Sequence, residues 1–285
     1  MIETLQASYA FIVGACIGSF LNVCIGRWPD GLSVVAPRSR CPKCGHRITA
    51  KENIPIFSWF LLRGRCSGCG ERISMQYPIV ELIVALGWLA AYLSFGMSFM
   101  AVRVAVFGTV LLGIALTDAK HFLIPDGFTV FGVIWVLITV FVGVYLGEYY
   151  PFARPWDAIL GMFVGAGAIS VTGWLGEVML KRPAMGFGDV TLMAVVGAAL
   201  GPQRALLTIF VAALIAPIVL LGIVYPLTSR GTTDEAGQLG LPLESSASWK
   251  RRELPFGVFL APAALVTLLY GDRMIESYLR FSGLR

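Results

Sequence analysis

Two aspartates beside long apolar segments are the residues of this sequence best suited to chemistry. Asp118 ends one apolar segment, and Asp189 closes the motif Gly186-Phe187-Gly188-Asp189, which opens another. Gly186 and Gly188 would let the backbone adopt positive φ angles and approach a substrate strand closely. A carboxylate at membrane depth is costly, so its presence indicates a functional site. Because one of two close carboxylates keeps its proton while the other accepts one from water, the pair predicts an intramembrane aspartyl protease.

Each acid also has a purely structural interpretation. Asp189 could cap the start of a helix through a backbone N–H group, and Asp118 could be a solvated residue at the end of a span. Asp126 has the position of a first-turn acid, which the helix dipole favours. Spacing alone does not choose between Asp118 and Asp126 as the partner of Asp189, and Glu81 and Glu177 are further candidates.

The composition is that of a membrane protein. Hydrophobic residues make up 57% of the 285 and charged residues 14%, whereas roughly a quarter of an average soluble domain is charged. The mean hydropathy is +0.77. Apolar runs recur near the ~20 residues that a helix needs to cross a bilayer. We therefore expect an all-α polytopic membrane protein with about eight transmembrane helices, at residues 9–25, 78–95, 99–116, 127–146, 158–180, 190–200 (a short span), 206–227 and 256–270.

The basic residues predict the orientation of these spans. Nine of the 22 lysines and arginines lie in the first hydrophilic loop, at 27–72. If that loop is cytoplasmic and eight spans alternate, 16 of the 22 face the cytoplasm, as the positive-inside rule requires. Both termini are then outside, and Asp118 and Asp189 both lie at the cytoplasmic boundary. The first run lacks the basic flank of a signal peptide and should be retained, and topology explains the net charge of +5 without a nucleic-acid partner.

The hydrophilic insert between the first two spans carries two C-x2-C pairs separated by 21 residues. Thiolates at this spacing can form two tight turns around one tetrahedral ion, and the glycine that follows each pair suits such turns. Four thiolates leave no open coordination position, so we expect a structural Zn2+ ion. A reducing cytoplasm argues against disulfides, and His46 is not needed as a ligand. The expected ligands are Cys41, Cys44, Cys66 and Cys69.

The sequence predicts three parts: a first transmembrane helix, a hydrophilic insert, and a membrane core that begins at residue 78. Within the core, residues 228–253 are polar and rich in Gly, Ser and Thr, which favours a flexible cytoplasmic loop. Small-xxx-small spacings at Gly161 and Gly165, and at Gly197 and Gly201, favour close helix contacts. The expected parts are the first transmembrane helix (1–27), a cytoplasmic four-cysteine zinc-binding loop (28–77) and a seven-helix membrane protease core (78–285).

A series of uncommon motifs runs in order along nearly the whole chain. It resembles the type IV prepilin peptidases, the bacterial leader peptidase/N-methyltransferases of type IV pilus and type II secretion systems. The acid regions of the resemblance are Asp118-x5-Ile124-Pro125-Asp126 and Met185-Gly186-Phe187-Gly188-Asp189. The other matching segments are Gly18-Ser19-Phe20-Leu21-Asn22-Val23, Arg38-Ser39-Arg40-Cys41-Pro42-Lys43-Cys44, Asn53-Ile54-Pro55-Ile56-Phe57-Ser58, Leu62-Arg63-Gly64-Arg65-Cys66, Tyr77-Pro78-Ile79-Val80-Glu81-Leu82 and Leu254-Pro255-Phe256-Gly257.

The resemblance implies the activity and the site residues. Members of the family cleave the short, positively charged leader of prepilins and pseudopilins at the cytoplasmic face of the bacterial inner membrane, typically between a glycine and a phenylalanine. Carried over by motif, the catalytic residues are Asp118 and Asp189, with Gly186, Gly188 and Asp126 in supporting roles. Many members also methylate the new N-terminus with S-adenosyl-L-methionine, and the cysteine-bearing loop is associated with that bifunctional group.

One position departs from the family pattern. Many members have a lysine two residues after the motif aspartate, where this chain has Thr191. A nearby cation would favour the ionised carboxylate, so its absence leaves the tuning of Asp189 open without removing a catalytic group. No glycine-rich strand–turn–helix signature marks a methyl-donor site. A cleavage-only peptidase and a membrane transporter with a zinc-ribbon insert are the alternative functions.

Overall fold

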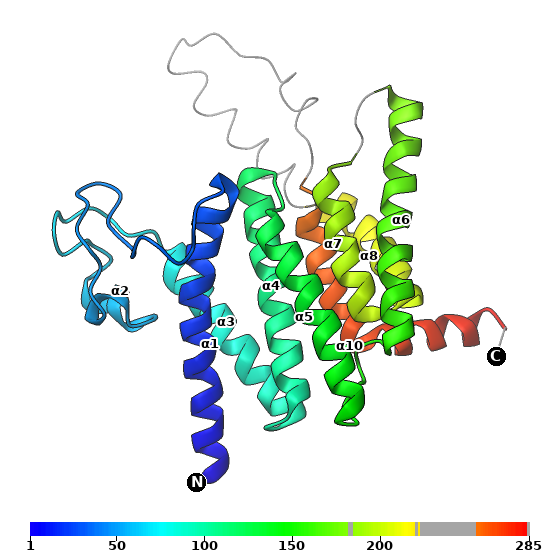
Figure 1. Cartoon of the computed structure of the whole chain (residues 1–285), viewed down its shortest axis with the longest axis horizontal. Helices are drawn as coiled ribbons and strands as arrows, with labels where there is room; N and C mark the ends of the chain where they lie inside the picture. Colours follow the sequence, from blue (N-terminus) through cyan, green and yellow to red (C-terminus); the bar gives the residue numbers. More distant parts are fainter. Residues whose placement is uncertain (182–184, 220–221, 223–254, 284–285) are drawn as a thin grey trace.

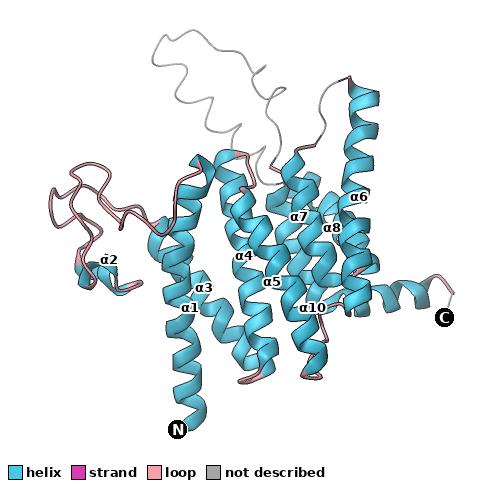
Figure 2. Ribbon diagram, in the orientation of Figure 1, coloured by secondary structure: helices cyan, strands magenta, loops and turns pink. Residues whose placement is uncertain are grey.

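The computed structural model describes residues 1–181, 185–219, 222 and 255–283, and this part of the chain forms helices and no strands (Figures 1 and 2). The predicted all-α membrane fold is therefore confirmed. The predicted loop 228–253 lies outside the described residues. The long helices are α1 (Ile2–Arg27), α3 (Gln76–Phe95), α4 (Phe99–His121), α5 (Asp126–Tyr145), α6 (Pro155–Leu180), α7 (Phe187–Leu200), α8 (Pro202–Val219) and α10 (Gly257–Phe281).

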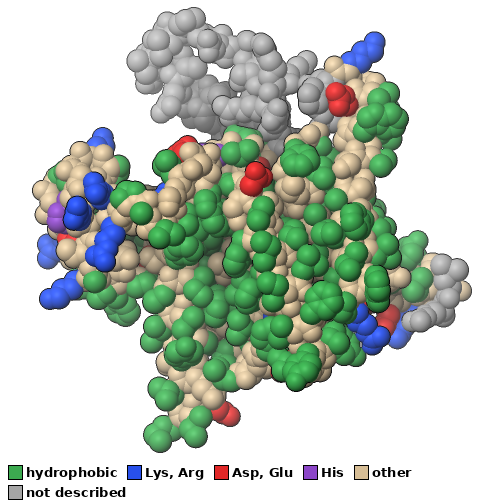
Figure 3. Space-filling model, viewed as in Figure 1, with side chains coloured by type: hydrophobic (Ala, Val, Ile, Leu, Met, Phe, Trp, Pro, Cys, Tyr) green, Lys and Arg blue, Asp and Glu red, His purple; other side chains and the backbone are tan. Residues whose placement is uncertain are grey.

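Seven of these helices, all except α7, are long and apolar enough to cross a membrane. Hydrophobic side chains cover the face of the bundle in Figure 3, whereas lysines and arginines gather on the insert that leaves it. Beyond Val219 the predicted span at 206–227 lies outside the described residues, except for residue 222. Elsewhere most of the helices extend past the predicted spans: α1 begins at Ile2 rather than at residue 9. The largest difference is at α10, which continues past Tyr270 to Phe281. The added part is polar as well as apolar, which is why the hydrophobic run ended earlier than the helix.

Helix α7 is short, and neighbouring helices enclose it. At 14 residues and 1.5 Å per residue it is about 21 Å long, less than the ~30 Å of a bilayer core. It packs against α5, α6, α8 and α10, and the side chains from Leu192 to Leu200 are almost all buried. Helix α7 corresponds to the predicted short span at 190–200 but begins three residues earlier, at Phe187.

Glycines bring two helix pairs into close contact, and the small-xxx-small spacing predicted the first of them, between α6 and α7. A Cβ atom added to Gly161 or to Gly197 would collide with the carbonyl oxygen of the other residue, so α6 and α7 touch backbone to backbone. Between α1 and α3, a Cβ on Gly18 would lie 2.7 Å from the Cα of Glu81. Larger side chains at these positions would push the helices apart.

Helix termini that are far apart in the sequence lie together at one end of the bundle. The end of α4 and the beginnings of α5, α7 and α10 lie together, at the top of Figure 1, whereas the N-terminus lies at the opposite end. The insert of residues 31–75, with the short helix α2 (Phe57–Leu61), extends from the side of α1 and α3. We call the end that carries the α4–α5 turn the aspartate end.

Candidate active site

Asp118 lies in the last turn of α4 and is only 6% exposed. Its Oδ2 atom accepts a hydrogen bond of 3.2 Å from the backbone N–H of Val258, in the first turn of α10. The next residue back, Gly257, is so close that an added Cβ would lie 2.8 Å from the same oxygen. Helix α4 ends just beyond, where Phe122 takes a left-handed conformation with φ 53°. The carboxyl group is therefore held between the end of α4 and the start of α10.

Asp189 lies in the first turn of α7 and is 9% exposed. The N-cap of this helix is Gly186, and no side chain caps it, so the capping interpretation of Asp189 is wrong. The backbone N–H of Asp189 instead donates to the carbonyl of Gly186, over 3.2 Å. A buried acid without a capping role at the start of a short buried helix is a candidate for chemistry.

Ile124 joins the two acid segments through direct packing. A Cβ on Gly188 would lie 2.8 Å from the Cβ of Ile124, and a Cβ on Gly257 would lie 3.1 Å from its Cδ1. The segment between α4 and α5 therefore touches the beginnings of both α7 and α10. Asp118, which touches Gly257, and Asp189, which follows Gly188, are thus brought to the same place by contacts with Ile124.

Neither motif glycine has an unusual backbone, and only Gly188 is required by packing. Gly186 has φ −78° and Gly188 lies within α7, so the predicted positive φ angles are wrong. Gly188 is needed because Ile124 occupies the space of a side chain, whereas Gly186 has no neighbouring atom closer than 3.9 Å to an added Cβ. The sequence alone could not show which neighbour Gly188 meets.

The other candidate acids are exposed or bonded to another part of the chain. Asp126 is the first residue of α5 and is exposed, as expected of a first-turn acid. Glu177 is exposed on α6. Glu81 is buried on α3, where its Oε2 atom accepts a 2.6 Å hydrogen bond from the backbone N–H of Ile56 in the insert. The missed contributor is the backbone of Val258, for which the only signal was the Pro255-Phe256-Gly257 motif beside it.

The four cysteines of the insert form a cluster that suits a zinc ion. All four sulfur atoms lie within 4.8 Å of one another. The Sγ atoms are 3.9 Å apart for Cys41 and Cys69 and 4.0 Å apart for Cys44 and Cys66. Tetrahedral zinc with Zn–S bonds of about 2.3 Å would place its sulfur ligands roughly 3.8 Å apart. The residues therefore fit the ion.

The two cysteine turns have the same construction. The N–H of Gly45 donates to Cys41, and that of Gly70 donates to Cys66, at 3.0 and 2.9 Å. Both glycines have φ +72°, a conformation that strains other residues. Backbone N–H groups of Cys44 and Lys43 lower the pKa of the Cys41 thiol to about 6. The Cys69 thiol shifts the other way: the backbone N–H of Glu71 lowers its pKa, but contacts with the other three cysteines outweigh this and raise it to about 12. Metal binding therefore has to displace protons from part of the cluster.

A polar cluster beside the cysteines supplies the hydrogen-bond partners of the His46 ring. Its Nε2 atom lies 3.1 Å from the Ser67 hydroxyl and 3.3 Å from a Glu52 oxygen. Hydrogen bonds from Ser67 and from Thr49 lower the pKa of Glu52 to about 2. His46 is thus occupied by a hydrogen-bond network and stands outside the four-sulfur cluster.

Comparison with known proteins agrees with the motifs. Residues 12–95 match the bacterial peptidase A24 N-terminal domain, and residues 105–221 match the type IV leader peptidase family. A prepilin leader peptidase/N-methyltransferase of Stutzerimonas stutzeri is 33% identical over 96% of this chain and 94% of its own length. The Myxococcus xanthus protein of the same name is 34% identical over 94% of this chain and 91% of its own length.

An Escherichia coli relative, named type 4 prepilin-like proteins leader peptide-processing enzyme, is also similar. It is 36% identical over 79% of this chain and 86% of its own length. No solved structure matches the chain significantly.

Proposed function

Since this chain belongs to the type IV leader peptidase family, we propose that it removes the leader peptide of type IV prepilins and type II secretion pseudopilins. We further propose that it methylates the new N-terminus. The names of the Stutzerimonas stutzeri and Myxococcus xanthus relatives support both steps, and that of the Escherichia coli relative supports leader processing. The observation that carries the cleavage proposal is the convergence of Asp118 and Asp189 at one end of the bundle.

The proposed chemistry assigns complementary roles to the two carboxyl groups. One keeps its proton and donates it to the oxygen of the scissile carbonyl, while the other accepts a proton from the attacking water. No covalent intermediate forms with the enzyme. The hydrogen bond from Val258 supports this assignment because it orients Asp118 independently of substrate. Both acids are buried, so they are surrounded mainly by protein groups rather than by bulk water.

The proposed metal is a structural zinc ion bound by Cys41, Cys44, Cys66 and Cys69. The ion would tie the two cysteine turns together and supply folding free energy to a small insert. Four sulfur ligands leave it no position for substrate. The sulfur spacing supports this proposal.

S-adenosyl-L-methionine is the proposed methyl donor, on the strength of the relatives' names. The apolar cavity between α3, α4 and α10 does not suit it, because no charged side chain lines that cavity and the donor carries charges and an adenosine. Methylation is thus proposed without an assigned donor site.

The proposed setting is the bacterial inner membrane, with the aspartate end facing the cytoplasm and both termini outside. The concentration of basic residues on the insert supports this orientation. The proposed division places the first helix at 1–27, the zinc-binding loop at 28–77 and the protease core at 78–285, which includes 228–253. Cysteine accessibility at Lys120→Cys, from each side of sealed vesicles, would test the orientation.

Mass spectrometry of a purified prepilin, incubated with the enzyme and S-adenosyl-L-methionine, tests both activities. Loss of the leader together with one added methyl group is the expected result. Loss of the leader alone would indicate the cleavage-only alternative. An unchanged prepilin would contradict the proposal and favour the transporter alternative, which no relative described above supports by name.

A further inference from the structure

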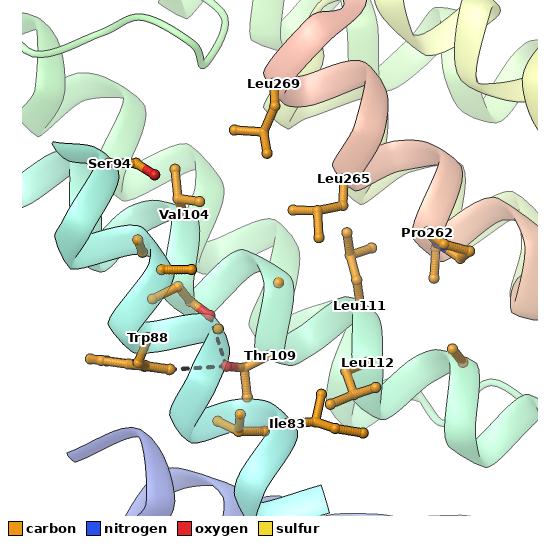
Figure 4. Close-up of a pocket in the computed structure, with 18 of the residues that line it drawn as sticks. Ile83, Trp88, Ser94, Val104, Thr109, Leu111, Leu112, Pro262, Leu265 and Leu269 are labelled. Atoms are coloured by element: carbon orange, nitrogen blue, oxygen red, sulfur yellow. Dashed lines mark hydrogen bonds between the residues drawn. The ribbon is translucent and has the colours of Figure 1, made fainter. Parts of the chain in front are cut away.

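An apolar groove of about 570 Å³ runs along the bundle between α3, α4 and α10 (Figure 4). Helix α4 forms its floor, and both α3 and α10 pack against α4. The lining residues lie within 83–95 of α3, 104–115 of α4 and 258–270 of α10. At 1.5 Å per residue, each wall is about 18 Å long, more than half of the ~30 Å core of a bilayer.

The groove opens on the outer surface of the bundle. Ile83 and Tyr270 on its two walls are 46% and 52% exposed, and Gly87 and Pro262 are exposed as well. In Figure 4, Leu265 and Leu269 of α10 face the α3 side across the leucines of α4. A hydrophobic segment in the surrounding bilayer could therefore enter the groove sideways.

One end of the groove reaches the candidate active site. Val258 lines the groove, and its backbone N–H donates to Asp118. Ala115, on the floor, precedes Asp118 by three residues and so lies on the same side of α4. The groove is thus continuous with the carboxyl group proposed to act on the scissile bond.

The walls suit the close approach of another helix. Gly87 of α3 has no atom within 4 Å of an added Cβ, and Gly108 of α4 has only a Leu265 methyl group, at 3.9 Å. Small residues let helix backbones approach in a membrane, where packing replaces the hydrophobic effect as the driving force. Pro262 has no N–H for the carbonyl of Val258, so a backbone acceptor at the active-site end lacks its usual helical donor.

We propose that this groove seats the hydrophobic segment of the substrate as a helix, with its cytoplasmic end at Val258. A face of about 12 residues would fill the groove, and the peptide bond just beyond that face would meet Asp118. The inference rests on the proposed cleavage of prepilins, whose hydrophobic segment directly follows the leader. Continuity with Asp118 favours this occupant over a lipid chain or a second copy of the protein.

Filling the groove at Gly87 tests the proposal. In Gly87→Leu the new side chain enters the groove, so cleavage of full-length prepilin in liposomes should fall about tenfold or more. Gly167→Leu is the matched control because Gly167, on α6, also has no atom within 4 Å of an added Cβ and lies outside the groove. Both changes replace a helical glycine with a better helix former, and the control should cleave at the wild-type rate.

Comparing the wild type with Gly87→Leu distinguishes failure of the groove proposal from failure of the cleavage proposal. If the wild-type protein fails to cleave prepilin, the proposed function fails. If the wild type cleaves and Gly87→Leu cleaves equally well, the groove proposal alone is wrong.

A photo-cross-linking residue provides a second measurement. Placed at Leu112 on the groove floor, it should form a cross-link to the hydrophobic segment of prepilin, whereas the same residue at the exposed Phe163 of α6 should not. Cross-links from Leu112 to lipid or to a second enzyme molecule, without any to prepilin, would overturn the proposal.

Discussion

The backbone N–H of Val258 donates to the Asp118 carboxylate across 3.2 Å, and the two residues are 140 positions apart in the chain. This bond attaches the start of the last helix to the end of α4. Because the acceptor is a buried side chain, losing the donor would leave an oxygen with fewer partners and the carboxyl group less restrained. The geometry of the candidate site therefore depends on α10 as well as on the two helices that carry the acids.

Gly257 should not tolerate a side chain. In Gly257→Ala the new Cβ would lie 2.8 Å from Asp118 Oδ2, which is too close without movement of α10 or of the carboxyl group. A misplacement of about 1 Å can cost roughly a hundredfold in rate, so prepilin cleavage should fall by between about tenfold and a hundredfold. Initial cleavage rates in detergent would measure it.

Gly26→Ala is the control for that variant. Gly26 is exposed on α1 and has no atom within 4 Å of an added Cβ. Its cleavage rate should match the wild type. Equal rates for Gly257→Ala and Gly26→Ala would show that the close contact beside Asp118 does not matter for activity.

The helices and the cysteine cluster could be predicted from the sequence because each depends on a local pattern of residues. The apolar runs predicted the helices, and the two C-x2-C pairs predicted the cysteine cluster. The role of Gly188 could not be predicted, because it is set by Ile124, which packs on it from another segment. The contact between Asp118 and Val258 likewise requires the tertiary packing of α10. The Pro255-Phe256-Gly257 motif before Val258 does not indicate that Asp118 is the residue it contacts.

Removing one cysteine should remove the metal. Cys66→Ser replaces one of four sulfur ligands, so bound zinc should fall from one ion per chain to well below one. The insert should then become sensitive to limited proteolysis, because the ion contributes to its folding. Metal analysis of the purified protein measures the first effect, and the fragment pattern measures the second.

Cys16→Ser is the matched control. Cys16 is an exposed residue of α1 and is not part of the four-sulfur cluster. It should keep a full complement of zinc. An unchanged zinc content in Cys66→Ser would contradict the four-cysteine site.

Glu81 should hold the insert against the membrane helices. It accepts a 2.6 Å hydrogen bond from the N–H of Ile56, and Ile56 has φ 65°, a strained conformation for a β-branched residue. In Glu81→Ala the contact is lost at a net cost of about 1 kcal/mol, so proteolysis near Ile56 should accelerate roughly fivefold. Zinc content should not change, because the cysteines are untouched.

Glu177→Ala provides the comparison for this effect, since Glu177 is also a helical glutamate but is exposed on α6. Its proteolysis pattern should match the wild type. Equal proteolysis of the two variants near Ile56 would show that Glu81 does not restrain the insert.

Prepilin cleavage by Asp118→Asn, Asp189→Asn and Asp126→Asn, followed by mass spectrometry, tests whether the two buried aspartates are the catalytic pair. Asparagine keeps the shape of aspartate but cannot exchange a proton with water or with the scissile carbonyl. We expect no detectable cleavage by the first two variants and near wild-type cleavage by the third, because Asp126 is an exposed first-turn residue. Retained cleavage by Asp118→Asn or by Asp189→Asn would contradict the proposed pair.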